Sequence, residues 1–365
     1  MGFEVDMLNI GDTKSGDAII IRWGNLYGER SEQKVVVIDG GYKSDGERVV
    51  NHIREYYHTD VIDLLVLTHP DNDHVGGLAT ILNSIEVKEF WIHKPWEHNV
   101  GIAEKFADGR VTDNSIATKL EKSLQKAYDV VQIAEEKNIP IREPFTGLSF
   151  DNGRFQVIGP SQDYYIELIP NFKGMPQKST DESLIEMASV GLEAFKASIK
   201  KLITVVADWF VDEKIDNNDT TSAQNNASVI TQLSIDGTSL VFTGDAGITA
   251  LTHAEPYINK GQLSFIQIPH HGSRRNIGPD ILNKILGEPT SEQRNVRLTA
   301  IASSAKNGHP KHPHQAVLNA FIRRGANVLK TTEQAICHRS NAPDREGWTT
   351  VTGEEFKVSY EVEEA

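Results

Sequence analysis

The stretch HPDNDHVGG, residues 69–77, places two histidines and two aspartates within six residues and follows them with two glycines. The apolar run DLLVLT at 63–68 precedes it, and the apolar residues after Gly77 recur at helical spacing. This pattern predicts a loop between a strand buried on both faces and a helix, a position where ligand-binding side chains concentrate. Imidazole and carboxylate groups are ligands of divalent metal ions, so the stretch is a candidate metal site. A polar turn with two incidental histidines is the alternative.

Three other apolar runs also end next to residues that bind metals. The runs are 34–38, 238–243 and 263–268, and the residues at their ends are Asp39, Asp245, His270 and His271. Strand ends of packed sheets meet along common edges, so we expect these side chains to lie near residues 69–77. Each one alone could belong to an ordinary turn, but the coincidence favours a shared site in which Asp245 lies between two metal ions.

The remaining patterns divide the chain into strand-rich ends and a different middle part. Further strands are predicted at 18–23, 155–158, 228–235, 297–302 and as a terminal pair within 327–339; helices are predicted from near Asp113, from near Ser179 to Ile203, over 279–286 and over 314–324. Residues 161–225 are interpreted as a largely helical insertion that serves as a lid or as a docking surface for a protein partner. An excursion without a function explains this segment equally well. Residues 341–365 form a C-terminal extension.

Composition limits the class of protein. The 365 residues are 39% hydrophobic and 24% charged, which is typical of a globular chain and excludes a fibrous or disordered one. No run approaches the ~20 apolar residues of a membrane-spanning helix, and the first residues lack the pattern of a signal peptide. We therefore expect a soluble, cytoplasmic protein without a membrane partner. Cys337 is the only cysteine, so any metal must be held by histidines and carboxylates.

Charge is distributed unevenly along the chain. The net charge of −14 argues against a protein that coats nucleic acid, yet residues 260–339 carry 12 Lys and Arg against 4 Asp and Glu. This stretch is either a side of the molecule that faces anions or an accident of surface charge. Arg274 and Arg275 follow the histidine pair within it, where they would contact a phosphate or simply be solvated.

Several of these motifs together resemble the metallo-β-lactamase fold hydrolases and, within them, the hydrolase domain of the DNA-uptake protein ComEC. The similar pieces are MLNIGDTKSGDAIIIR, VVVIDGG, THPDNDHVGG, NNASVI, VFTGDAG, IPHHGS, NGHPKHPHQAVLNAF and NVLKTTEQAI. They occur in the order of the family and cover residues 5–95 and 225–340. Asp71 makes the similarity specific, because most branches of the superfamily have histidine there.

The resemblance implies an αββα sandwich over residues 1–340, with two divalent metal ions at one edge. The position of each residue in the family motifs implies its role: His69 and Asp71 bind the first metal, Asp73, His74 and His271 bind the second, and Asp245 bridges them. Asp39 would be a buried acid that fixes the orientation of a ligand.

The sequence departs from the superfamily at the third histidine of the first metal. No histidine occurs within 99–252, so this ligand is missing or is replaced by Asn226, Ser228 or water. Asn226 and Ser228 are also candidate substrate contacts. The carboxylate of Asp71 is a hard ligand, which suits manganese as well as zinc.

Further roles are assigned by position beside these motifs. Neighbours on an extended chain point to opposite sides, so His270 is free to contact the substrate or to protonate a leaving group while His271 binds metal. His309 would contact the substrate. His93 would face substrate or metal, although packing among neighbouring aromatic side chains is favoured. The residues expected to act in catalysis are Asp73, His270 and His309.

Together these features indicate a metal-dependent hydrolase that uses a metal-bound hydroxide. The leading interpretation is a phosphodiesterase, and more specifically a nuclease, that acts on nucleic acid or on a nucleotide phosphodiester. The alternative is a small-molecule phosphoesterase that acts on a phosphocholine ester or a cyclic nucleotide. Hydrolysis of a lactam or thioester, and a binding module without activity, are disfavoured.

Overall fold

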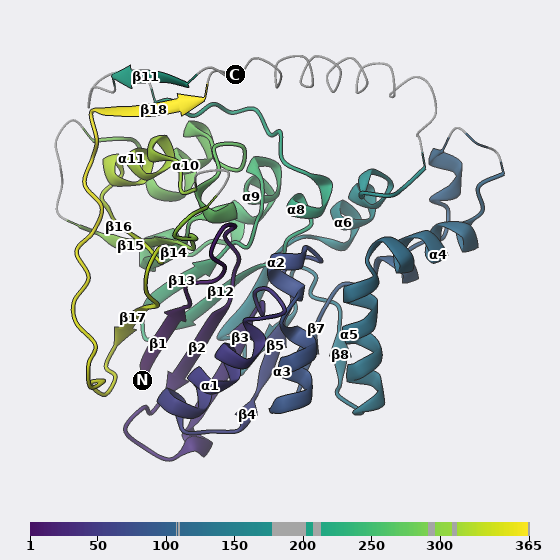
Figure 1. The fold of residues 1–365 in the computed structure, drawn as a ribbon, viewed down its shortest axis with the longest axis horizontal. Helices are drawn as coiled ribbons and strands as arrows, with labels where there is room; N and C mark the ends of the chain where they lie inside the picture. The colour runs from purple at the N-terminus through teal and green to yellow at the C-terminus, as the bar shows by residue number, and fades with distance from the viewer. Residues whose placement is uncertain are drawn as a thin grey trace.

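Two seven-stranded sheets lie face to face at the centre of the molecule (Figure 1). The computed structural model describes residues 1–106, 108, 110–176, 202–206, 213–290, 296–308 and 312–363. The first sheet has the strand order β17 (Ile336–Ser340), β1 (Gly2–Met7), β2 (Ile19–Gly24), β3 (Gln33–Ile38), β5 (Leu64–Val66), β7 (Phe90–Trp91) and β8 (Ile141–Arg142). The second has the order β16 (Ala326–Lys330), β15 (Leu298–Ala302), β14 (Leu263–Gln267), β13 (Thr238–Phe242), β12 (Ile230–Ile235), β10 (Phe155–Gly159) and β9 (Ser149–Phe150).

Helices cover the outer face of each sheet. The first sheet is covered by α1 (Gly46–Tyr57), α3 (Leu78–Ser84), α4 (Asp113–Ser123) and α5 (Gln125–Glu136), and the second by α9 (Ile248–Ala254), α10 (Pro279–Leu286) and α11 (Gln315–Arg323). Alternate residues of β2 show why its sequence is apolar throughout, since Ile19 and Ile21 face the other sheet while Ile20 faces the helices. The expected αββα sandwich is confirmed.

Two elements of the first sheet layer gave no recognised pattern in the sequence. Strand β1 carries Glu4 and Asp6, both completely buried, which hides its strand character from a hydrophobicity pattern. These two acids are neutralised by Arg22 from β2 and by Arg345 from far along the chain. Helix α1 was also not predicted, although its buried face packs on the same sheet.

Three predicted elements need correction. The single helix expected from near Asp113 to Val131 is two helices, α4 and α5, because the backbone of Leu124 is not helical. The strands expected as a terminal pair within 327–339 exist as β16 and β17, but they lie at the edges of different sheets, so the turn between them passes from one sheet to the other. Ile203, assigned to a helix, lies in strand β11 (Leu202–Val206), which pairs with β18 (Ser359–Glu363). The rest of that predicted helix falls outside the described residues. The β-branched residues at 203–206 favour a strand when a partner strand is available.

The described ends of segment 161–225 belong to the core. Tyr165 of α6 (Gln162–Leu168), with Ile169 and Phe172 after it, packs into the apolar layer under α4 and α5. At the other end, Ile215 packs with the helices of the second sheet, and α8 (Ala223–Asn226) leads into β12. The role of the segment as a lid or as a docking surface stays a prediction.

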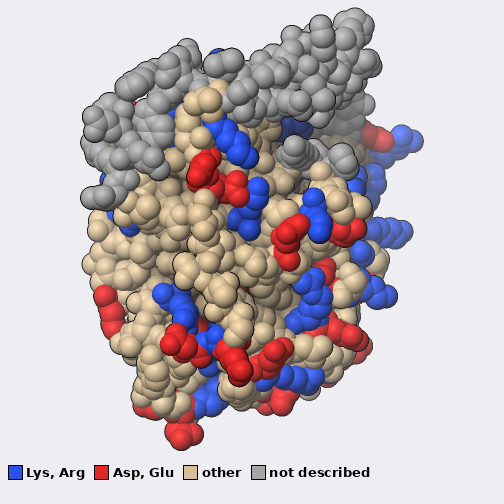
Figure 2. Space-filling view, turned by 60° about the vertical axis from the view of Figure 1, so that its left-hand side comes forward, with Lys and Arg blue, Asp and Glu red and all other residues tan. Residues whose placement is uncertain are grey.

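Some of the basic side chains of the stretch 260–339 form contacts inside the fold. Arg324 is completely buried, where it pairs with Glu213, and Arg297 donates hydrogen bonds to the carbonyl oxygens of Leu286 and Arg324. Figure 2 shows acidic and basic side chains intermingled on the face it presents. Part of the excess of positive charge in this stretch is therefore used inside the fold. None of the described helices is both long and apolar enough to cross a membrane.

Candidate metal centre

The carboxyl ends of β3, β5, β13 and β14 bring the predicted metal-binding residues to one edge of the sandwich. The loop after β5 leads into the short helix α2 (Asn72–Val75), whose backbone is tied to the loop after β3 by a hydrogen bond from Gly40 N to the carbonyl oxygen of His74. The glycine pairs make this approach possible, because a Cβ on Gly77 would lie 2.1 Å from the carbonyl oxygen of Gly40. Asp39 thereby lies beside His74.

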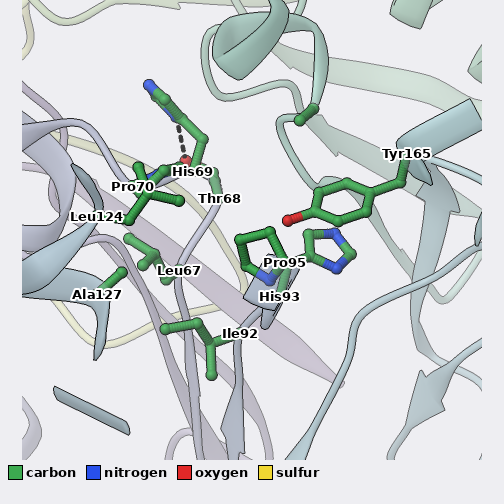
Figure 3. A pocket seen from close by; sticks show the side chains of 11 residues that line it. Leu67, Thr68, His69, Pro70, Ile92, His93, Pro95, Leu124, Ala127 and Tyr165 are labelled. Carbon is green, nitrogen blue, oxygen red and sulfur yellow. Dashed lines mark hydrogen bonds between the residues drawn. The ribbon is translucent and has the colours of Figure 1, made fainter. Parts of the chain in front are cut away.

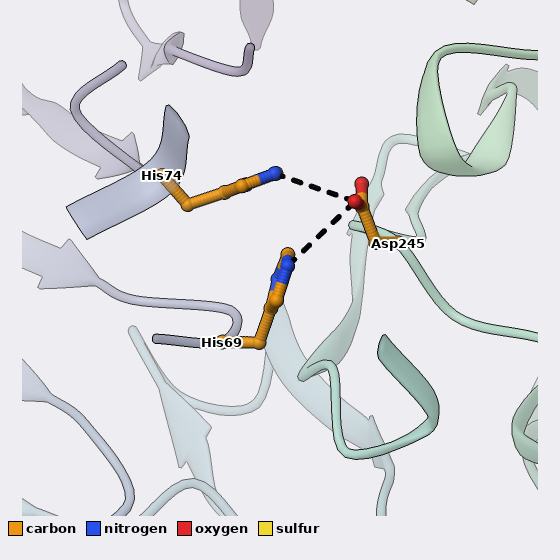
Figure 4. Close-up of side chains that lie close together, drawn as sticks. All are labelled: His69, His74 and Asp245. Atoms are coloured by element: carbon orange, nitrogen blue, oxygen red, sulfur yellow. Dashed lines mark ion pairs between the residues drawn. The ribbon is translucent and has the colours of Figure 1, made fainter. Parts of the chain in front are cut away.

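Three imidazoles surround one carboxylate oxygen of Asp245. The Oδ2 atom lies 3.6 Å from Nε2 of His69, 3.5 Å from Nε2 of His74 and 3.5 Å from Nε2 of His270. Figure 4 shows His69 and His74 reaching Asp245 from the opposite side of the edge. Asp71 adds a half-exposed carboxylate 3.8 Å from Nε2 of His69. The third imidazole at this carboxylate is thus His270, from a different strand end than the one where the superfamily histidine was sought.

A second cluster adjoins the first through His74. The Oδ2 atom of Asp73 lies 3.5 Å from Nε2 of His271 and 3.8 Å from Nε2 of His74. His69, His74 and Asp245 on one side, and Asp73, His74 and His271 on the other, place ligand atoms close enough together to share an ion.

Four buried atoms at these clusters have no hydrogen-bond partner: Nε2 of His69, His74 and His271, and Oδ1 of Asp245. Leaving a buried polar atom unsatisfied costs about 1–3 kcal/mol, so their convergence calls for a group that all of them can bind. Divalent metal ions fit this donor set, because neutral imidazole nitrogens and carboxylates are their usual ligands.

Hydroxyl groups and buried acids hold the histidines in the orientation that leaves Nε2 free. The hydroxyl of Thr68 donates to Asp39 over 2.7 Å, so it accepts from Nδ1 of His69 at 3.0 Å. Nδ1 of His74 donates to Asp39 directly over 2.7 Å. Asp39 therefore orients two predicted ligands, one of them through Thr68.

A parallel arrangement supports His271. Its Nδ1 donates to the hydroxyl of Ser303 over 3.0 Å, and that hydroxyl donates to the buried Asp17. Gln267 donates to the other oxygen of Asp17 over 2.9 Å. Sequence reasoning did not single out Asp17, Thr68 or Ser303; the only signal was a Gly-Asp pair before a predicted strand, inside a motif already noted for its resemblance.

The charges of the centre attract cations. Burial alone would lower the pKa of His271, but Asp245, Asp73 and Asp17 raise it to about 9. The pKa of His74 is raised well above its usual range in the same way, against the effect of burial, by Asp245, Asp39 and Asp73. These shifts favour the protonated form of both histidines in the absence of a metal ion, and a metal ion would displace the protons on binding.

The histidine pair has an unexpected backbone. Both residues have positive φ, 47° for His270 and 57° for His271, so the extended chain assumed from the sequence is wrong. Their rings nevertheless address different carboxylates, Asp245 and Asp73. The side chain of His270 is 29% exposed, and its Nδ1 lies 2.8 Å from Oδ1 of Asn276. His270 therefore stands where the centre meets solvent.

The other predicted site residues have varied positions. Ser228 accepts a hydrogen bond from the backbone N–H of Asp245 and so positions that ligand. The amide oxygen of Asn226 accepts a hydrogen bond from Gly247 N, and its NH₂ group donates one to Asp219. Asn226 therefore connects the segments that carry these two residues. Arg275 is exposed and Arg274 half-buried beyond the histidine pair, and His309 lies outside the described residues.

His93 borders a small pocket beside His69 (Figure 3). Its ring lies between those of Phe145 and Tyr165, with centroids 4.7 and 4.2 Å away, and both of its nitrogens lack a partner. Burial lowers its pKa to about 3, so the ring is neutral. The cavity volume of about 10 Å³ admits roughly one water molecule, so the pocket is too small for a substrate group.

Comparison with known proteins agrees with this geometry. Residues 17–285 match the family model described as the metallo-beta-lactamase superfamily. ComE operon protein 3 of Bacillus subtilis (strain 168) is 23% identical over 350 residues, which is 90% of this chain and 32% of that protein. The chain therefore spans about a third of the length of this relative.

The chain is also similar to solved structures, at lower sequence identity. The metallo-beta-lactamase fold protein YhfI from Bacillus subtilis has a TM-score of 0.42 and 8% identity, with 93% of this chain and 100% of that chain covered. The hydrolase AbOPH of the beta lactamase superfamily has a TM-score of 0.34 and 12% identity, with 68% and 70% covered.

Proposed function

Because the chain belongs to the metallo-β-lactamase superfamily, we propose that it is a metal-dependent phosphodiesterase with nucleic acid as its substrate. The observation that carries the proposal is the pair of adjoining clusters around Asp245 and Asp73, with four buried ligand atoms unsatisfied. Three carboxylates, those of Asp71, Asp73 and Asp245, make the ligand set harder than imidazoles alone, which suits zinc or manganese. The resemblance of the motifs to the hydrolase domain of a DNA-uptake protein supports the choice of nucleic acid.

The chain's own residues would divide the work of hydrolysis. His69, Asp71, Asp73, His74, Asp245 and His271 would hold two metal ions, which supply Lewis acidity toward phosphoryl oxygens and lower the pKa of water. Asp39 and Asp17 keep the imidazoles aligned through Thr68 and Ser303. His270, at the exposed side of Asp245, would donate a proton to the leaving oxygen.

The second candidate is a small-molecule phosphoesterase, which the same centre would serve equally well. The two candidates differ in what lies around the centre, since a small ester needs no binding surface beyond it. Lactam and thioester hydrolysis stays disfavoured, because the branch of the superfamily that the motifs resemble is not linked to these reactions.

The test is metal analysis followed by an activity screen. Purified protein, stripped and then loaded with zinc or manganese, should bind two ions and cleave bis(p-nitrophenyl) phosphate and single-stranded DNA or RNA. Asp245→Asn should lose metal and activity, whereas His253→Ala, which removes an exposed histidine of α9, should change neither. Metal-loaded protein that hydrolyses a β-lactam or lactone but no phosphodiester would refute the proposal.

A further inference from the structure

We propose that a groove beside the metal-ligand turn binds the phosphodiester backbone of a polynucleotide next to the cleaved bond. The inference rests on the proposed nuclease function and says where the substrate lies. The groove has a volume of about 700 Å³, within the range of about 300–1,000 Å³ typical of ligand sites. It lies between the loop after β3, helices α1 and α3, and the start of α5, on the helical face of the first sheet (Figure 1).

The groove lies beside the turn that carries the predicted ligands Asp71 and Asp73. Asn72, which lines it, stands between the predicted ligands Asp71 and Asp73 in the sequence and begins α2. Tyr42 also lines it and donates a hydrogen bond to the carbonyl oxygen of Ser15. The loop that carries Tyr42 packs against the metal-ligand turn, because Gly77 N donates a hydrogen bond to the carbonyl oxygen of Gly41 over 3.1 Å. A chain lying in the groove would therefore reach the centre.

The lining suits a chain of phosphates. Lys43 from the loop after β3 and Lys126 from the start of α5 both line the groove, and neither forms an ion pair among the residues that the structure describes. Ser44 and Thr80 add hydroxyl donors between them. Such groups hold phosphates without reading bases, as expected of a nuclease with little sequence preference.

One acid, Glu47, also lines the groove and would repel phosphate. Its charge adds a second test, because lysine and glutamate variants of the same groove should change polynucleotide binding in opposite directions. Removal of Lys43 or Lys126 should weaken polynucleotide binding, and removal of Glu47 should strengthen it. A groove without a role in binding would show neither the weaker polynucleotide binding of the lysine variants nor the stronger binding of the Glu47 variant.

The experiment compares Lys43→Gln, Lys126→Gln and Glu47→Gln with wild type. Lys137→Gln is the matched control, because Lys137 is an exposed lysine at the far end of the same helix α5. The readouts are anisotropy of a fluorescent single-stranded oligonucleotide at several salt concentrations, cleavage of the same strand, and cleavage of bis(p-nitrophenyl) phosphate. Metal content is measured for every variant.

We expect each lysine variant to raise Kd and KM for the strand and to flatten the slope of log K against log salt by about 0.7. Cleavage of the small ester and metal content should stay at wild-type values, and Glu47→Gln should lower Kd. Lysine variants that bind and cleave the strand like Lys137→Gln would overturn this inference and leave the proposed function standing. Wild type that cleaves the small ester but neither binds nor cleaves the strand would overturn both the inference and the choice of nucleic acid.

Discussion

Replacement of Asp39 by asparagine keeps the shape of the side chain and removes its charge. The residue has a φ of 61°, and asparagine tolerates this left-handed conformation, so the backbone should not change. The carboxylate accepts three hydrogen bonds, from Thr68 N at 2.8 Å, from the Thr68 hydroxyl at 2.7 Å and from Nδ1 of His74 at 2.7 Å. An amide offers one oxygen in place of two and turns an NH₂ group toward a donor, so at least one of these bonds is lost.

The expected loss is in metal affinity. Removal of the partner that orients a ligating histidine weakens metal binding by about 10–100-fold, or about 1.4–2.7 kcal/mol. Both ions should be affected, because Asp39 orients His74 directly and His69 through the hydroxyl of Thr68. Thr68→Val removes the hydroxyl that links Asp39 to His69 and leaves the hydrogen bond between His74 and Asp39, so it should weaken chiefly the site that contains His69.

Competition with a chelating dye measures both dissociation constants for zinc, and circular dichroism of the metal-free proteins verifies that the variants fold. Two weakened sites in Asp39→Asn and one in Thr68→Val is the expected pattern. Wild-type affinity at both sites in folded Asp39→Asn would refute the reasoning that this acid aligns the ligands.

Three further predictions concern other residues. Arg345→Met should lower the unfolding free energy by about 3–5 kcal/mol at neutral pH, because it leaves buried Asp6 without its bidentate partner. Burial alone would raise the pKa of Asp6, but His52 and Arg345 hold it below its usual range, so this stabilisation is present above the unfolded pKa of about 3.9 and is lost as pH falls through the folded pKa; equal losses in urea unfolding at neutral pH and at about pH 3 would contradict this. His271→Ala should lose metal, whereas His270→Ala should keep both ions and lose on the order of 10²-fold in turnover with a changed pH profile, and the reverse pattern by elemental analysis would exchange their roles. His93→Phe should leave metal content unchanged and should not lower Tm, because the ring has no hydrogen-bond partner to lose; metal loss in this variant would make His93 part of the centre.

Site residues that are close neighbours in the chain could be predicted from the sequence. His69, Asp71, Asp73 and His74 occur within six residues after one apolar run, so any fold that makes this run a strand brings them together. Asp39, Asp245 and His271 could be added because each follows a buried strand, and strand ends share an edge. The apolar patterns predicted individual strands and helices, whereas the αββα sandwich was implied by the resemblance of the motifs to a known family.

The groups that support these ligands could be identified only from the tertiary structure. Asp17 and Ser303 are 286 positions apart, yet the hydrogen bond between them supports the orientation of His271. No local sequence pattern predicts such a contact. The buried charges of β1 were missed for a similar reason, since their partner Arg345 is more than 300 residues away. Hydrophobic periodicity reports which face of an element is buried, whereas a buried polar group is stabilised by a specific partner that any part of the chain can supply once the chain has folded.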